Sequence, residues 1–138
     1  MSYYEIERAL SKAARAAIGK FPISCTSDEL SDTDSIEGFW FKLSNLRAQS
    51  NVATMGSTGE DNHPGVYQID INLPKNQGEG PLLQKADEIA KLFPAGSSFT
   101  SNGQAVKLTG TSVSPTRPVN GFLRVSVSLT YYSRSQRR

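Results

Sequence analysis

The chain has one cysteine and one histidine, Cys25 and His63, and they are the only residues that could form a thiol–imidazole pair. Such a pair supports nucleophilic catalysis when the base lies within hydrogen-bonding reach of the nucleophile. Both residues fall in segments predicted to be loops, and their spacing does not indicate that they meet. We therefore favour an incidental thiol and a surface histidine. One cysteine excludes an intrachain disulfide, and a structural zinc site needs four ligands.

Four acidic residues gather in an early polar stretch: Asp28, Glu29, Asp32 and Asp34. Two carboxylates can act as a general acid and base, and calcium binds carboxylate oxygens at regular spacing within a framed loop. The sequence around these four residues lacks that regular spacing, so we expect a solvated loop. No catalytic residue, cofactor-binding residue or metal ligand is predicted, and we expect the protein not to be an enzyme.

The glycines of Gly78-Glu79-Gly80-Pro81 precede a predicted helix, where backbone N–H groups could hold a phosphate. No Gly-Lys-Ser/Thr follows, and Pro81 removes one of the donors. A turn before a helix explains the pattern, and no cofactor is predicted.

Nucleic-acid binding is a further alternative. The basic tail Ser133–Arg138 could contact phosphates, and Phe39, Trp40 and Phe41 could stack on bases. Alternation places Phe39 and Phe41 on one face of a strand, which favours core packing for them and leaves Trp40 for a subunit contact. The formal net charge is +2, with 15 basic and 13 acidic residues, which argues against a dedicated nucleic-acid binder.

Two helices are predicted among the elements that position these candidate residues. In the first, Ser2 and Glu5 have capping-box spacing, and Gly19 is a natural stop. Pro81 opens the second helix at a first-turn position. The residues at helical spacing form two apolar faces: Ile6, Leu10, Ala13 and Ala17 in the first helix, and Leu82, Ala86, Ile89, Ala90 and Phe93 in the second.

Two strong strands are predicted at 66–73 and 123–131, where apolar and polar residues alternate. Each has a single apolar face, so the opposite face is expected to meet water or a partner. Weaker strands are predicted at 39–43, 47–52 and 105–113, the first two separated by a polar turn at Ser44-Asn45.

The remaining segments are predicted to be loops, namely 20–37, 54–65, 97–103 and 115–118, and 133–138 is predicted to be a flexible basic tail. The element order predicts an α+β fold, with two helices packed on one face of a mostly antiparallel sheet of four to five strands. We expect a single domain over 1–138. No apolar signal region or membrane span is found in the sequence, so a soluble intracellular protein without membrane contact is expected.

Several motifs together resemble the tail terminator, or tail completion, proteins of lambda-like long-tailed bacteriophages. The resemblance covers about residues 37–132. It is carried by a strand after a glycine, a Gly-rich turn, an amphipathic helix that ends at Phe, and a closing strand: Gly65–Pro74, Gly78–Pro81, Ala86–Ala90 with Leu92-Phe93, and Asn120–Val127.

The resemblance implies a structural virion protein that assembles in the host cytoplasm. It would form a ring, as a hexamer of identical chains, at the head-proximal end of the tail. That ring would cap the tail tube, end its elongation and meet the neck or head-completion protein, while DNA passes through the lumen without specific binding. A head–tail joining protein is the alternative within virions, and a small nucleic-acid-binding module is the second alternative.

A cyclic ring needs two different patches on each subunit. We expect these patches in the 44–64 region and on the outer face of the strand Leu123–Tyr131, because both are polar and extended. The predicted interface residues are Trp40, Arg47, Gln49, Asn51, Arg124, Ser126 and Ser128.

Overall fold

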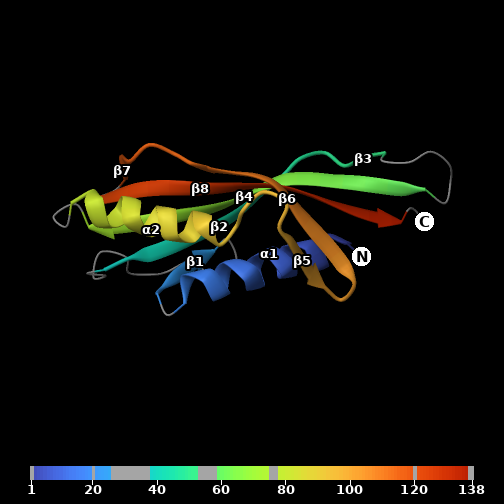
Figure 1. Ribbon diagram of the computed structural model, residues 1–138, viewed down its shortest axis with the longest axis horizontal. Helices are drawn as coiled ribbons and strands as arrows, with labels where there is room; N and C mark the ends of the chain where they lie inside the picture. Colours follow the sequence, from blue (N-terminus) through green and yellow to red (C-terminus); the bar gives the residue numbers. More distant parts are fainter. Residues whose placement is uncertain are drawn as a thin grey trace.

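The computed structural model describes residues 2–19, 21–25, 38–52, 59–74, 78–119 and 121–136. Two helices and eight strands follow one another along the chain (Figure 1): α1 Ser2–Ile18, β1 Ile23–Cys25, β2 Trp40–Arg47, β3 Asn51–Val52, β4 Glu60–Pro74, α2 Gly80–Lys91, β5 Ser98–Ser101, β6 Gln104–Val113, β7 Arg117–Val119 and β8 Phe122–Gln136.

Both predicted helices are confirmed. Gly19 ends α1 with a φ of 79°, a left-handed conformation that glycine adopts without strain, and its N–H donates to the Arg15 carbonyl. Pro81 lies in the first turn of α2. No helix in the described ranges is long and apolar enough to cross a membrane.

The sheet is larger than predicted, and it is mixed. Its strands lie in the order β1-β2-β4-β8-β6-β5, with β3 paired to β4 and β7 paired to β8. β1 runs parallel to β2, whereas the other pairs are antiparallel. The prediction of an α+β fold is therefore right, and the prediction of a four- to five-stranded, mostly antiparallel sheet is corrected. The additional strands are short or polar, so they have little apolar alternation to predict them.

Polar pairing extends the central strands well beyond their apolar part. β4 begins at Glu60 inside the predicted loop 54–65, and β8 continues to Gln136 inside the predicted tail. The two strands pair in unbroken register from Glu60↔Gln136 to Pro74↔Phe122. The far end of this ribbon, residues 60–65 with 131–136, is called the arm below. Residues 53–58 and 137–138 lie outside the described ranges.

Three further predictions are corrected. β2 runs unbroken through Ser44-Asn45, where a turn was expected, so only Asn51–Val52 remains of the second short strand. The predicted turn 97–103 contains β5, and the predicted loop 115–118 contributes to β7. Cys25 ends β1 and His63 lies in β4, so neither is a loop residue.

One hydrophobic core lies between the helices and one face of the sheet. The buried residues Tyr67, Ile69, Ile71 and Leu73 of β4 point to this face, together with the odd-numbered residues 123–131 of β8. Apolar residues of both helices complete the same cluster: Ile6, Ala9, Leu10, Ala14 and Ile18 from α1, and Leu82, Ala86 and Ile89 from α2. This side of the sheet is called the helix face, and the other the helix-free face.

Part of the helix-free face is buried within the chain itself, at Trp40, Asp70, Asn72 and Ser126. After β6, residues 114–119 continue along the same edge of β8, and β7 pairs with the start of β8. Figure 1 shows this segment on the side of the sheet opposite α1. We call residues 114–119 the strap. The expectation that this face meets only water or a partner is corrected at this end.

Candidate subunit-interface surfaces

A buried polar network lies on the helix-free face near the strap. The Asp70 carboxylate, 3% exposed, accepts hydrogen bonds from Ser126 Oγ and from Gln68 Nε2, the latter at 2.8 Å. Arg124 Nη1 lies 4.0 Å from the other Asp70 oxygen, and its Nε donates to Asn72 Oδ1 at 2.7 Å. This network forms because β4 and β8 place polar residues opposite one another on this face: Asp70 pairs with Ser126, and Asn72 pairs with Arg124.

The strap is held to this network by hydrogen bonds. Arg117 donates to Ser114 Oγ at 3.2 Å and to Ser126 Oγ at 2.9 Å, and the Ser114 hydroxyl accepts from the Ser126 N–H at 2.9 Å. Arg117 and Arg124 are direct cross-strand neighbours. Two like charges side by side repel. The buried Asp70 carboxylate offsets this repulsion, because it lies 4.0 Å from Arg124 and is linked to Arg117 through the Ser126 hydroxyl.

Trp40 completes this end of the face. It is 7% exposed, and its ring meets Phe122 edge-on at 5.5 Å between centroids. Its carbonyl accepts from Asn72 Nδ2 at 3.3 Å, which joins it to the network. The indole Nε1 and the Thr116 hydroxyl are buried and have no hydrogen-bond partner among the residues that the structure describes. The structure thus brings together Trp40, Arg124 and Ser126 from the predicted set, with half-buried Ser128 next along the same face.

The other predicted interface residues lie elsewhere. Arg47 ends β2 on the helix face; its side chain is 46% exposed, 3.8 Å from Glu7 and over the Tyr3 ring. Gln49 is exposed in the segment between β2 and β3. Asn51 pairs through its backbone with Asn62; its side chain lies outside the described set. Trp40, Arg124, Ser126 and Ser128 therefore lie on the helix-free face, whereas Arg47 lies on the helix face.

A second cluster joins α1 to the arm. His63 is 8% exposed, which corrects the prediction of a surface histidine, and its Nδ1 lies 2.7 Å from Ser50 Oγ. Tyr3 Oη lies 2.6 Å from the same hydroxyl, and the Tyr3 and His63 rings meet edge-on. A serine this close to an imidazole has the geometry of a nucleophile and base. Here Tyr3 contacts both groups, so the pair acts as a link between helix and arm.

A hydrogen-bond chain from Tyr131 through Asn45 to Glu7 continues this cluster, and we call the contacts between α1 and the arm the joint. Tyr131 Oη donates to Asn45 Oδ1 at 2.7 Å, and Asn45 Nδ2 donates to Glu7 at 2.6 Å. Burial raises the pKa of Tyr131, since the neutral phenol is easier to bury than its anion. A β-carbon at Gly65 would lie 2.5 Å from the Tyr131 oxygen, so this contact requires glycine. Only the paired register of β4 and β8 reveals this role, because Gly65 and Tyr131 are distant in sequence.

The hairpin of β5 and β6 is tied to α1 by Glu5. Its carboxylate accepts hydrogen bonds from Ser101 Oγ at 2.6 Å and Asn102 Nδ2 at 3.1 Å. The Ser101 hydrogen bond is the main reason that the pKa of Glu5 is lowered, because it favours the charged carboxylate.

The two other sequence candidates contribute no site. The acidic cluster at 28–34 lies outside the described residues, as does the Cys25 side chain. At 78–81 the structure has a turn, with Gly78 at a φ of 84°, leading into α2. Among the described side chains, no group of three His, Cys, Asp or Glu residues is placed to hold a metal ion.

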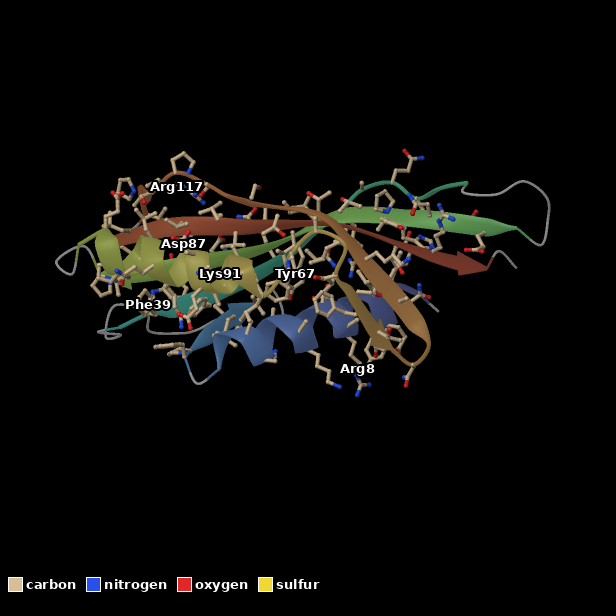
Figure 2. The ribbon with its side chains drawn as sticks, in the orientation of Figure 1. Arg8, Phe39, Tyr67, Asp87, Lys91 and Arg117 are labelled. Carbon is tan, nitrogen blue, oxygen red and sulfur yellow. The ribbon has the colours of Figure 1, made fainter. Side chains whose placement is uncertain are left out.

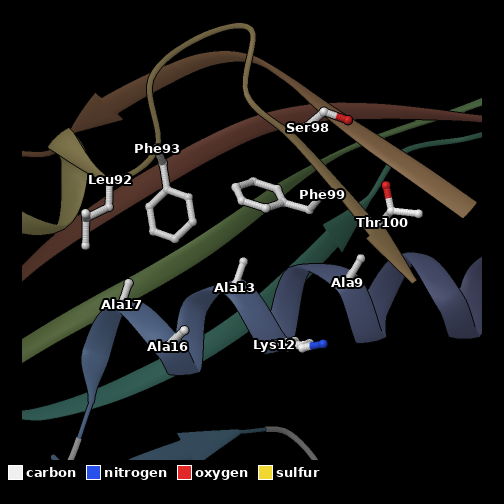
Figure 3. A pocket seen from close by; sticks show the side chains of 10 residues that line it. All are labelled: Ala9, Lys12, Ala13, Ala16, Ala17, Leu92, Phe93, Ser98, Phe99 and Thr100. Carbon is white, nitrogen blue, oxygen red and sulfur yellow. The ribbon is translucent and has the colours of Figure 1, made fainter. Parts of the chain in front are cut away.

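An open groove of about 530 Å³ lies beside α1 (Figure 3). One wall is formed by small residues of the helix, including Ala13 and Ala17, and the other by Leu92, Phe93 and Phe99. Phe93 and Phe99 meet edge-on at 5.7 Å between centroids, and Leu92 is 54% exposed. The groove is mostly apolar and open along the helix.

Charge divides unevenly between the two faces. On the helix-free face, alternation along the strands and the printed contacts place five basic and two acidic residues: Lys42, Lys107, Arg117, Arg124 and Arg134, with Glu60 and Asp70. The other described charges lie on the helices and the helix face, six basic and six acidic: Arg8, Lys12, Arg15, Arg47, Lys85 and Lys91, with Glu5, Glu7, Asp61, Glu79, Asp87 and Glu88. Figure 2 shows Arg8 and Arg117 on opposite sides of the sheet.

The sequence matches the model of a family described as phage tail terminator protein over residues 5–131. This chain belongs to that family. The match runs from the first turn of α1 to Tyr131 in β8, so it includes nearly all of α1, the whole of α2 and the strap. The resemblance found in the motifs is confirmed, and the protein is a structural component of phage tails. Among curated proteins, none matches it.

Solved structures share the fold of this terminator-family protein. One, whose name states no function, has a TM-score of 0.68 and 23% identity, covering 94% of this chain and 91% of that one. Another belongs to the virion of a native gene transfer agent particle, with a TM-score of 0.53 and 15% identity, covering 98% of this chain and 99% of that one. The same fold therefore occurs in a virion component.

Proposed function

We propose that this protein forms the ring that caps the phage tail tube, ends its elongation and offers a surface to the neck. The observation that carries the proposal is the family match over nearly all of the described fold. The resemblance adds the expected hexamer of identical chains, with the tail tube protein on one side and the neck or head-completion protein on the other. The virion location at the head-proximal end of the tail follows from the same role.

The separation of the predicted interface residues supports a ring. A closed ring uses heterologous contacts, in which one patch of a subunit meets a different patch of its neighbour. In the proposed arrangement, Arg47 and Gln49 near the arm form one patch, and the strap with Ser128 forms the other. Ser126 accepts a hydrogen bond from Arg117 of the strap, Arg124 lies beside Asp70 on the same face, and Trp40 supports the same end of the sheet.

The first experiment is electron microscopy of particles assembled without this protein. Overlong or irregularly ended tails without heads are the expected result, because nothing would stop the tube from growing. Tails of correct length beside full heads would instead assign the protein to head–tail joining. Normal infectious particles would contradict both roles.

The arm patch is tested by complementation with point variants. Removing residues 54–64 would also delete the first five residues of β4, so Arg47→Ala with Gln49→Ala is the cleaner change. We expect this pair to fold and to restore tail length poorly. The matched control is Gln84→Ala with Lys91→Ala on α2, which removes one exposed amide and one exposed cation elsewhere. Equal complementation by the two variants would reject the arm as an interface.

A further inference from the structure

The net positive charge of the described chain lies entirely on the helix-free face. Five basic residues face two acidic ones there, whereas the charges on the helix side balance. One of the two acidic residues, Asp70, is buried and already contacts Arg124. Glu60 is therefore the one exposed described carboxylate on this face, beside Arg134 and Lys107.

The basic groups are spread along the face. Lys42, Arg117 and Arg124 lie at the strap end, and Lys107 and Arg134 lie at the arm end. Arg124 and Arg134 are ten residues apart on β8, which corresponds to about 33 Å of strand. Hydroxyl and amide side chains occupy the face between them, including Gln68, Ser128 and Thr130.

Three of the five cations are available to a partner. Lys107 and Arg134 are exposed and Lys42 is half-buried, and no described carboxylate forms an ion pair with any of them. Arg134 also lies over the Tyr132 ring at 5.9 Å, which orients its guanidinium on this face. Arg117 is bonded to Ser126 and Arg124 to Asn72, so both add to the positive potential from fixed positions.

We propose that the helix-free face binds the phosphate backbone of duplex nucleic acid without sequence preference. A linear polyanion can contact cations spread along about 33 Å, whereas an acidic patch on a folded protein would have to match the shape of the strap and arm as well. Hydroxyl and amide groups donate to phosphate oxygens and carry no sequence information. The proposal concerns the free chain before ring formation, because the proposed ring contact uses the strap and Ser128 on the same face.

Because few cations are involved, the affinity is weak and depends on salt. Non-specific binding of this kind has a dissociation constant of about 10⁻⁴–10⁻⁶ M, and the slope of log affinity against log salt is about 0.9 for each phosphate neutralised. Binding to a labelled duplex of arbitrary sequence, followed by fluorescence anisotropy between about 50 and 200 mM salt, measures this slope.

The test compares two triple variants with the same net charge. Lys42→Gln, Lys107→Gln and Arg134→Gln remove the available cations of the helix-free face; Arg8→Gln, Lys12→Gln and Lys91→Gln remove three exposed cations from the helices. Circular dichroism confirms that both fold. We expect the first triple to lower the salt slope by up to about 2.7 and the second to leave it unchanged.

Three results would overturn the proposal: equal losses in both triples, no duplex binding by the wild-type chain at low salt, or no change in the first triple. Competition with poly-glutamate gives a further test. If the helix-free face binds phosphates, duplex DNA should displace poly-glutamate when both are present at the same concentration of charge. Stronger binding of poly-glutamate would instead assign the face to an acidic protein.

Discussion

The same pair of strands carries two polar clusters on its opposite faces, and they are built differently. The strap cluster contains the buried Asp70 carboxylate, which lies beside Arg124 and is linked to Arg117 through the Ser126 hydroxyl. The joint cluster is mostly neutral, with Tyr131 and Asn45 at its centre and charged groups at its exposed margin. A buried charge left without its partner costs far more than a broken neutral hydrogen bond. The strap end should therefore tolerate much less change than the joint.

The largest expected effect is at Asp70. Asp70→Ala leaves Arg117 and Arg124 side by side without a carboxylate, and we expect a loss of about 3–5 kcal/mol in the free energy of unfolding. Urea denaturation measures it, with exposed Asp87→Ala on α2 as the control. If Asp70→Ala lowered the free energy of unfolding no more than Asp87→Ala does, the charged network would not be a main source of stability.

Next is Gly65→Ala at the joint. The added methyl would overlap the Tyr131 side chain, so we expect a loss of about 1–3 kcal/mol. A double-mutant cycle with Tyr131→Leu, which removes the aromatic ring, tests this reason. Gly65→Ala should lower the free energy of unfolding less in the Tyr131→Leu background than in the wild type. Additive losses in the cycle would mean that the contact with Tyr131 is not the reason for the glycine.

A smaller effect is expected from Tyr131→Phe, which removes the hydrogen bond to Asn45 and should cost about 1 kcal/mol at neutral pH. Its pH dependence is more informative. Since burial raises the pKa of Tyr131 in the folded state, its stabilising effect is complete below the unfolded pKa of about 10 and is lost as pH rises through the folded value.

The thermal midpoint of the wild type should therefore fall more steeply above about pH 10 than that of Tyr131→Phe. Parallel curves for the two proteins would show that the phenol does not titrate differently on folding.

The smallest effect is expected at the margin of the joint. Arg47→Ala breaks an exposed ion pair with Glu7, and such pairs contribute about 0.2–1 kcal/mol. Thermal unfolding should thus change little, and added salt should remove part of the difference. A loss above about 2 kcal/mol would place Arg47 in the structural part of the joint and would weaken its use as an interface probe.

The apolar periodicity of the sequence was enough to predict the central elements. Four alternating residues from Tyr67 to Leu73 predict the apolar part of β4, and spacing of three and four predicts α1 and α2, because a side chain that enters the core must recur with the period of its element. The arm and β5 lack this signal. Their residues are polar, and they form strands because each has a partner strand with which its backbone can pair.

The candidate surfaces were predicted as a set, but their arrangement was not. Trp40, Arg124, Ser126 and Ser128 alternate with apolar neighbours, which placed them on the face away from the core. Nothing in the sequence showed that part of that face would be buried beside the strap, or that Arg47 would lie on the other side. β7 was not predicted because it contains Pro118, and proline is unusual inside strands. Proline is tolerated in an edge strand, and β7 lies at an edge of the sheet.

By itself the sequence determined the fold class, the two helices, the centre of the sheet and the family, because these follow from periodicity and from the order of local motifs. Net charge is also a property of the sequence, and at +2 it argued against nucleic-acid binding. Only the tertiary structure decided how the charges of the described residues divide between the two faces. The helices take their balanced charges to one side of the sheet, and strand pairing brings Lys42, Lys107 and Arg134, which are far apart in sequence, onto the other.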